Sequence, residues 1–276
     1  MRQSNGYIIG FSAALTVVLG GLLALAATSL KKTQQFQIDL DKKKQILRAV
    51  MKIQEGSDIA ELYNSKIEGV VTNFKGDLLE DEAAEEINVR AEFKKSDYTE
   101  KLFPVFKFKS PVFEGKTEAY IIPVYGNGLW DEIWGFVAVE NDFNTIRGVV
   151  FDHKAETPGL GARITDEEIQ NRFKGRKIFN SNWSLEEGGK IKTVNMVKGE
   201  GNVFLASDMS SVDGLSGASM TTQGLNKMLA NYFTLYESYF ATEYLRVSKS
   251  SGSKKNTGDI YNFKSTDSFT KHVSLD

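Results

Sequence analysis

The chain has no cysteine and only two histidines, His153 and His272, among its 276 residues. Without cysteine it has no disulfides, thiolate zinc sites or cysteine-held iron–sulfur clusters. Two histidines are too few for a zinc site built mainly on histidine, so we expect no metal centre. The 34 basic and 36 acidic side chains nearly cancel. The balance gives no indication of the basic stripe typical of nucleic-acid binding, and we expect no nucleic-acid partner.

Charged residues are absent from the stretch 7–30. Its length exceeds the roughly 20 residues that a helix needs to cross a bilayer. The apolar run is also longer than the roughly 7–15 residues typical of a cleaved signal peptide, although Ala-Leu-Ala-Ala-Thr resembles a cleavage site. We therefore expect a short segment 1–6 and a retained transmembrane helix over 7–30. More lysines follow the span than basic residues precede it, a bias that favours a cytoplasmic domain.

After the span the sequence predicts a helical stalk over 31–55, a domain over 56–246 and a polar, flexible tail over 247–276. We expect Gly56 to end the stalk and Ser57 to cap the next helix. The apolar positions of that helix are Ile59, Leu62, Ile67 and Val70.

From about Val89 short β-branched and aromatic runs replace the helical spacing. They lie too close together for βαβ crossovers, which need a dozen or more linking residues, so the spacing favours antiparallel strands. Thr165 begins a capping signal for a short helix, and an apolar stripe from Met220 to Leu245 predicts the last one. The expected fold is α+β, with an antiparallel sheet flanked by helices. The expected strands are KLFPVFKFKS, TEAYIIPVYG, IWGFVAVE, TIRGVVFDH and KIKTVNMV.

The most informative stretch is DGLSGASMTTQGL, Asp213 to Leu225. Its simplest interpretation is a loop and helix cap, with Ser219 or Thr221 accepting a backbone N–H. A second interpretation is a serine nucleophile at Ser216, since the residues around it nearly match the Gly-x-Ser-x-Gly elbow of hydrolases. Such hydrolases have their histidine after the serine, and only His272 follows, in the expected flexible tail.

A third interpretation is a phosphate site. A glycine-containing turn that opens a helix presents free N–H groups and the positive end of the helix dipole. Gly217 lets the backbone approach closely and Ala218 leaves the site uncrowded. A phosphate there would lie beside the hydroxyl of Ser219, where it could become a phosphoester. An anchored domain that binds a phosphorylated ligand reversibly remains an alternative.

Three motifs together resemble the FMN-binding domains of respiratory flavoproteins. Asp213 to Ser219 resembles their flavinylation motif: Asp, two variable residues, Ser or Thr, usually Gly, Ala, then Thr or Ser. HKAETPGLGARI, from His153, resembles their Glu-Thr-Pro-Gly-Leu-Gly loop, and NGLWDEIWGFVAV, from Asn127, resembles the start of one strand. With the single span, the resemblance is greatest to the NqrC family of sodium-translocating NADH:quinone reductases. The corresponding FMN-binding subunit of the related Rnf electron-transport complexes is the nearest alternative.

The resemblance implies that FMN is covalently attached to Ser219 through a phosphoester, where most members have threonine. A magnesium-dependent flavin transferase would move the FMN from FAD and release AMP. Asp213 would serve in recognition or in orienting the turn, and Ser216, Gly217 and Ala218 complete the motif. Thr221 and Thr222 are the nearest rival anchors.

Glu156 begins the second motif, which forms a good turn at Thr157-Pro158-Gly159. The resemblance places this turn over the flavin, with a hydrogen bond from Thr157 and with Leu160 covering the ring. Glu156 either joins this site or faces solvent. Trp130 and Trp134 are expected in the core, and His153 at the end of a strand.

The resemblance also implies partners and a location. The other subunits would carry electrons from NADH through FAD and iron–sulfur centres to this FMN, and on through further flavins to quinone, coupled to sodium export. The chain has no dinucleotide fingerprint of its own. The family places the domain on the periplasmic side of the inner membrane, against the lysine bias.

Overall fold

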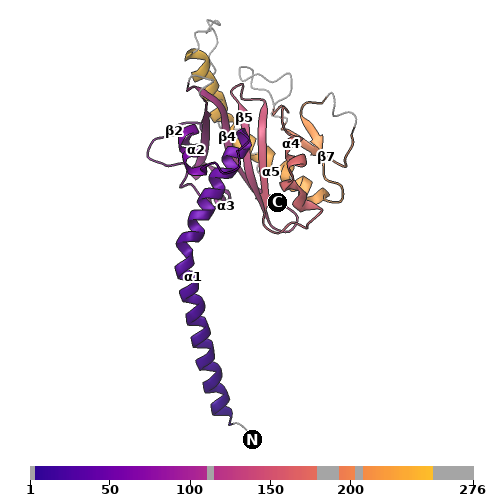
Figure 1. Cartoon of the computed structure of the whole chain (residues 1–276). Coiled ribbons are helices and arrows are strands. Elements are labelled where there is room, and N and C mark those ends of the chain that lie inside the picture. The colour runs from indigo at the N-terminus through magenta and orange to yellow at the C-terminus, as the bar shows by residue number, and fades with distance from the viewer. Residues whose placement is uncertain (1–3, 111–114, 179–192, 203–207, 251–276) are drawn as a thin grey trace.

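The computed structural model describes residues 4–110, 115–178, 193–202 and 208–250, with the backbone alone at 248–250. Helix α1 (Asn5–Val50) projects from a domain built on a β-sheet, and the N-terminus lies at its far end (Figure 1). The remaining elements are α2 (Ile59–Lys66), β1 (Ile67–Thr72), β2 (Leu78–Leu79), α3 (Val89–Lys94), η1 (Tyr98–Glu100), β3 (Phe103–Lys109), β4 (Thr117–Asn127), β5 (Glu132–Glu140), β6 (Ile146–His153), η3 (Gly161–Thr165), α4 (Glu167–Asn171), β7 (Asn195–Val197), β8 (Ser211–Asp213) and α5 (Ser219–Ser250).

Helix α1 has the length and composition of a membrane anchor. Its most apolar part has a mean hydropathy of 2.3 and is not buried against the rest of the described chain. The helix continues unbroken to Val50 and buries Ile46 and Leu47. The predicted end at Gly56 is wrong, because Met51 is already extended and its amide closes the last turn on the Leu47 carbonyl. At this point the helix reaches β6, where any side chain at Gly148 would lie 2.6 Å from the carbonyl oxygen of Ala49.

The central sheet has the order β2-β1-β3-β4-β5-β6 and is antiparallel throughout. Alternate side chains face opposite layers, as the pleat requires. On β4, Tyr120 and Ile122 pack with α5, whereas Ala119 and Ile121 pack with the end of α1. The predicted α+β fold with an antiparallel sheet flanked by helices is confirmed. Strand β7 falls within the predicted strand KIKTVNMV, of which residues 190–192 lie outside the described residues, whereas β8 and its parallel pairing with β7 were not predicted.

Two predicted caps are wrong. Asp58, not Ser57, caps α2 by accepting from the amides of Ala60 and Glu61. Thr165 does not cap α4, since its hydroxyl donates to the Ala162 carbonyl. Two apolar residues assigned to the second helix, Ile67 and Val70, lie instead in β1.

Helix α5 begins at Ser219 and runs to Ser250, so it extends into the predicted tail. The predicted apolar stripe is confirmed: it packs against the sheet, mainly on β4. The rest of the tail, with His272, lies outside the described residues. The stripe includes Leu225, Met228, Leu229, Tyr232, Phe233 and Tyr236, all buried.

Candidate functional site at the start of α5

The three motifs converge at the first turn of α5. A Cβ atom at Gly128 would lie 2.3 Å from the Glu156 carboxylate. One at Gly161 would lie 2.4 Å from both Glu156 and the Thr221 hydroxyl. One at Gly224 would lie 2.3 Å from the carbonyl oxygen of Asn127. Only glycine fits at these contacts, so the fold brings together segments that lie far apart in the sequence.

Glu156 is the residue that joins the three motifs. Its side chain is buried, with Oε1 accepting from the Trp130 amide at 2.9 Å and Oε2 accepting from the Thr221 hydroxyl at 2.6 Å. The alternative that Glu156 faces solvent is therefore wrong. A carboxylate can be buried at low cost only when such donors satisfy it.

The predicted turn after Glu156 is confirmed. The Leu160 amide donates to the Thr157 carbonyl at 3.1 Å, and Gly159 has a φ of 73°. Pro158 followed by a glycine with positive φ is the pattern of a type II turn. Thr157 and Leu160 are both exposed. The turn therefore presents its side chains to solvent.

Trp130 is not in the core, contrary to expectation. Its side chain is 67% exposed, and its indole N–H donates to the Thr157 hydroxyl at 3.1 Å. Trp134 is half-buried and packs against the core. Trp130 is exposed because it precedes β5, at the edge where the chain enters the sheet. Its exposure brings an indole ring to the surface beside the 157–160 turn.

Four exposed apolar side chains lie in these motifs or directly after them in the sequence. We call this group the apolar collar; its exposed fractions are Leu129 48%, Trp130 67%, Leu160 41% and Met220 55%. Leu160 reaches the flavinylation motif, since a Cβ atom at Gly217 would lie 2.9 Å from its side chain. Large side chains of this kind commonly mark a binding surface when they gather on one face.

Ser219 is the first residue of α5 and is exposed. Gly217 has a φ of 77°, and the buried Ala218 accepts the first helical hydrogen bond, from Thr222. Ala218 thus stands at the capping position without a side-chain oxygen. Among the described residues, no backbone bond is donated by the amides of Ser219, Met220 or Thr221.

The other hydroxyls of the motif differ in accessibility. Ser216 is exposed, whereas Thr221 and Thr222 are buried. Ser219 and Thr221 both lie within the helix, so neither holds the capping position that the simplest interpretation gave them. Ser216 shares no hydrogen bond with His153 in the described structure; the His153 Nδ1 accepts from the Glu156 amide at 3.2 Å. His153 is the strand-end histidine that the sequence predicts.

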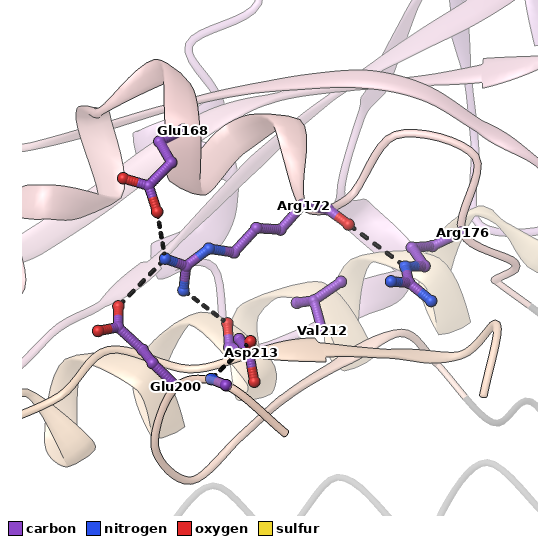
Figure 2. Close-up of a pocket in the computed structure, with 7 residues that line it drawn as sticks. Glu168, Arg172, Arg176, Glu200, Val212 and Asp213 are labelled. Atoms are coloured by element: carbon purple, nitrogen blue, oxygen red, sulfur yellow. Dashed lines mark hydrogen bonds and ion pairs between the residues drawn. The ribbon is translucent and has the colours of Figure 1, made fainter. Parts of the chain in front are cut away.

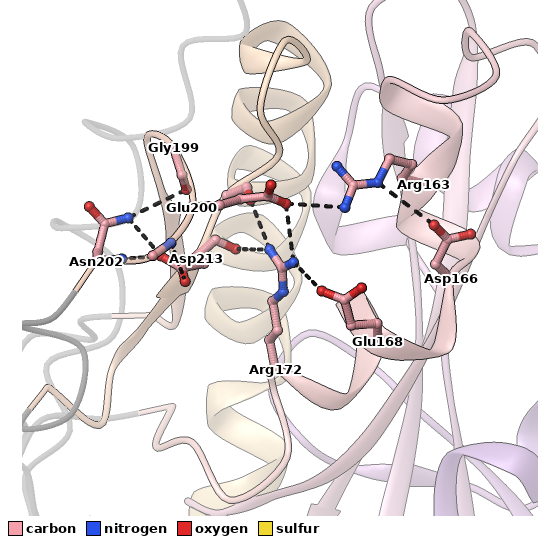
Figure 3. Close-up of polar contacts among 10 residues, drawn as sticks. Arg163, Asp166, Glu168, Arg172, Gly199, Glu200, Asn202 and Asp213 are labelled. Carbon is pink, nitrogen blue, oxygen red and sulfur yellow. Dashed lines mark hydrogen bonds and ion pairs between the residues drawn. The ribbon is translucent and has the colours of Figure 1, made fainter.

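Asp213 belongs to a polar network with Arg172, Glu200 and Asn202 and is not part of the exposed turn (Figure 3). Its carboxylate accepts from the amides of Gly201 and Asn202, at 2.9 and 3.1 Å. Burial raises the pKa of this carboxyl, but hydrogen bonds from Asn202 and Gly201 outweigh burial and lower it overall. A cavity of about 450 Å³ lies beside it, and Arg172 and Arg176 are among its lining residues (Figure 2).

The family of this chain follows from comparisons with known proteins. Residues 128–234, which contain the three motifs except for Asn127, match the FMN-binding domain family. The C subunit of the Na(+)-translocating NADH-quinone reductase of Haemophilus ducreyi is 33% identical over 233 residues, 79% of this chain and 86% of that protein. The chain belongs to this NqrC family.

Solved structures agree with this assignment. The crystal structure of the C subunit of the Na(+)-translocating NADH-quinone reductase from Parabacteroides distasonis superposes with a TM-score of 0.64 at 35% identity, covering 76% of this chain and 96% of that one. NqrC of Shewanella oneidensis gives a TM-score of 0.62 at 28% identity, covering 75% and 98%. The family is that of a subunit of an oxidoreductase complex, and the predicted resemblance is confirmed.

The residues at the start of α5 fit an FMN. The exposed Ser219 hydroxyl and the adjacent free amides suit a phosphate. The apolar collar suits a flat aromatic ring, and the absence of a side chain at Gly217 leaves room for Leu160 beside the motif. Donors and apolar groups of the required kinds are therefore present in the three motifs and directly beside them.

Proposed function

We propose that this chain is the membrane-anchored subunit that holds FMN covalently on Ser219 and relays electrons within a sodium-translocating NADH:quinone reductase. The FMN-binding domain and the NqrC relatives support a flavoprotein subunit of that complex. Covalent attachment and relay are the finer part of the proposal. FMN supplies the electron-transfer chemistry, while the protein supplies position and electrostatics.

The accessibility of the motif hydroxyls carries the proposal. Ser219 is exposed at the helix start, whereas Thr221 is 1% exposed and donates to Glu156. Thr222 is also buried. An incoming phosphate and a modifying enzyme can reach Ser219 without unfolding α5, which favours the serine over both threonines.

Each surrounding residue has a role in this proposal. The free amides and the helix dipole stabilise the phosphate. Gly217 leaves room for the Leu160 side chain beside it. Leu160 and Trp130 bury apolar ring surface, and the Thr157 hydroxyl provides a hydrogen bond. Glu156 holds the three segments in register. The phosphoester keeps the cofactor from dissociating at an otherwise open surface.

The proposal places the domain on the periplasmic side of the inner membrane, among the other subunits. The lysines after Leu30 favour the opposite side, but one short span docked among partners can tolerate a poor charge bias. The chain has no native cysteine, so Ser253→Cys gives a single thiol. We expect an impermeant maleimide to label it in intact cells. Labelling only after lysis would contradict this placement.

Attachment is tested by producing the full chain with its flavin transferase and viewing the denatured band under ultraviolet light. Wild type and Ser219→Thr should fluoresce, because the oxygen remains in reach, and Ser219→Ala should not. Thr222→Val is the matched control, since the Thr222 hydroxyl makes no hydrogen bond among the described residues and valine keeps its shape. A dark wild-type band would instead favour reversible binding of a phosphorylated ligand.

A further inference from the structure

Asp213 and Gly214, the first two residues of the flavinylation motif, form hydrogen bonds with residues outside the motif. We call this set the clasp: Arg172, just after α4, and the loop 199–202 that follows β7. The Asp213 carboxylate accepts from two amides of this loop and from the Asn202 side chain at 2.6 Å (Figure 3). The acidic residue of the motif is thus directed into the protein's own loop.

Arg172 holds the backbone of the same residues. One terminal nitrogen donates to the carbonyl oxygen of Gly214 at 2.9 Å and, more weakly, to that of Asp213 at 3.4 Å. The other donates to Glu168 at 2.7 Å and to Glu200 at 3.1 Å. Arg172 therefore links α4, the motif and the loop with one guanidinium group, whose fixed fork suits several acceptors at once.

The backbone at Gly214 lies very close to strand β7 and to the loop that follows it. Its amide donates to the Gly199 carbonyl, and a Cβ atom there would lie 2.0 Å from the Val197 carbonyl oxygen. The chain is pressed against β7 at this point. On the motif side, Arg172 donates to the carbonyl oxygen of Gly214.

The clasp also reaches the turn that covers the site. Glu200 accepts from Arg163 at 3.2 Å, and Arg163 follows Leu160 by three residues in η3. The two arginines therefore share one carboxylate. Through it the 157–160 turn and the motif are fixed to the same loop.

The clasp lies beside the open cavity and not in the apolar core (Figure 2). The Arg172 and Glu200 side chains are 17% and 30% exposed. Removing one of these charges should loosen the motif locally and leave the sheet and α5 packed. A local effect of this kind can be separated from a loss of stability.

We propose that Arg172, acting through Glu200 and the Asp213 loop, is a positioning residue for flavin attachment at Ser219. Asp213 then serves to order the motif rather than to be read directly by the transferase. The inference rests on the proposed function. In the attachment step the Ser219 oxygen bonds to the phosphorus of the FMN half of FAD. The pyrophosphate bond breaks, AMP leaves with the bridging oxygen, and the serine proton passes to solvent. No group is oxidised or reduced, and Arg172 touches none of the reacting atoms.

The test measures the rate of flavin incorporation into the purified full chain in detergent, with transferase, FAD and magnesium, as a function of chain concentration. If a variant populates the ordered motif only part of the time, the apparent affinity of the transferase for the chain falls in proportion to that populated fraction. For Arg172→Met we expect kcat/KM to fall about tenfold, mainly through KM, since charged hydrogen bonds are lost. Glu200→Gln should show a smaller loss in the same direction, and Arg172→Lys should recover part of the rate.

Two further measurements separate positioning from general destabilisation. Arg246→Met is the matched control, because it removes an arginine that pairs with Glu243 at 3.5 Å, on α5 near its C-terminal end. It should incorporate flavin at the wild-type rate. The unfolding midpoints of Arg172→Met and Glu200→Gln should stay close to wild type, while amide resonances of Gly214 and Gly217 should shift or broaden.

Other outcomes would overturn the inference. Wild-type kcat/KM in both Arg172→Met and Glu200→Gln, with Asp213→Asn inactive, would mean that the transferase reads Asp213 directly. A rate loss matched by a lowered unfolding midpoint and not relieved by Arg172→Lys would reduce Arg172 to a structural residue. Absence of flavin from wild type would contradict the proposed function itself, which makes the two failures distinguishable.

Discussion

The two ends of α5 belong to one helix but have opposite environments. Toward its C-terminal end Phe233, Tyr236 and Phe240 are at most 1% exposed, and Glu243 forms a buried ion pair with Lys107 of β3 at 2.8 Å. At its N-terminal end Ser219 and Met220 are exposed, and the capping residue Ala218 has no side-chain oxygen. One end secures the helix on the sheet. The other can therefore leave donors and apolar groups uncovered, as a binding surface requires.

This contrast predicts that stability and flavin attachment are separable. The largest loss of stability should come from Glu243→Ala, which leaves the Lys107 charge buried without its partner. We expect the free energy of unfolding to fall by about 3–5 kcal/mol, measured by denaturant titration. The chain that remains folded should still carry flavin.

The double variant Lys107→Met with Glu243→Leu is the control for this prediction. Apolar residues of similar size often replace a buried ion pair with little loss. Most of the stability should therefore return. Failure of the double variant to recover would mean that the pair stabilises the helix by more than charge compensation.

A smaller loss is expected at Tyr236. Its buried hydroxyl donates to the Pro104 carbonyl at 2.7 Å. Tyr236→Phe removes this buried hydrogen bond, at a cost of about 0.5–1.5 kcal/mol. Denaturant unfolding measures the change, and flavin incorporation should be unaffected. A change in flavin incorporation without a change in stability would contradict the separation of the two ends.

At the exposed end, a substitution should change stability little and flavin properties more. Because Leu160 is 41% exposed, Leu160→Ala should cost the flavin-free chain less than about 1 kcal/mol. In the flavin-loaded chain the same change should expose the part of the FMN ring that Leu160 covers. We expect the absorption spectrum and the electron-transfer rate to change while attachment persists. If both stay as in wild type, the 157–160 segment is only a turn.

The smallest effect is a dependence on pH at Asp213. The pKa of its carboxyl is lowered in the folded chain. The carboxylate therefore stabilises the fold at pH values above its unfolded pKa of about 3.9, and this stabilisation is lost as pH falls through the folded pKa. The difference in unfolding midpoint between wild type and Asp213→Asn should be constant from pH 7 to about pH 5 and shrink below it. A difference that grows on acidification would contradict this assignment.

Local patterns predicted much of this molecule. The four long strands and the stripe of α5 follow from residue spacing, and Pro158-Gly159 predicts its turn. Strand β1 was missed because Ile67 and Val70 continue the helical spacing of the preceding residues. Helix α1 ends at Val50, where the Ala49 carbonyl lies close to Gly148, and no local pattern contains such a contact.

The site was predicted only in part for the same reason. The resemblance pointed to the hydroxyls and the turn, but the role of Glu156 depends on partners 26 and 65 residues away. Arg172 lies 42 residues from the Gly214 carbonyl that it contacts. Residues whose importance comes from such pairings carry no signal in their immediate neighbours. Trp130 is an error in the other direction. An aromatic residue expected in the core is exposed, because it lies in the loop just before β5.

The central claim, that Ser219 is the anchor, is tested most directly by locating the flavin on the chain. Trypsin should release the peptide 199–227, since no lysine or arginine lies between Lys198 and Lys227. That peptide contains Ser216, Ser219, Thr221 and Thr222. Fragmentation in a mass spectrometer should place one phosphoester-linked FMN on Ser219 and leave both threonines unmodified. An FMN found on Thr221 or Thr222, or on no residue of this peptide, would contradict the account.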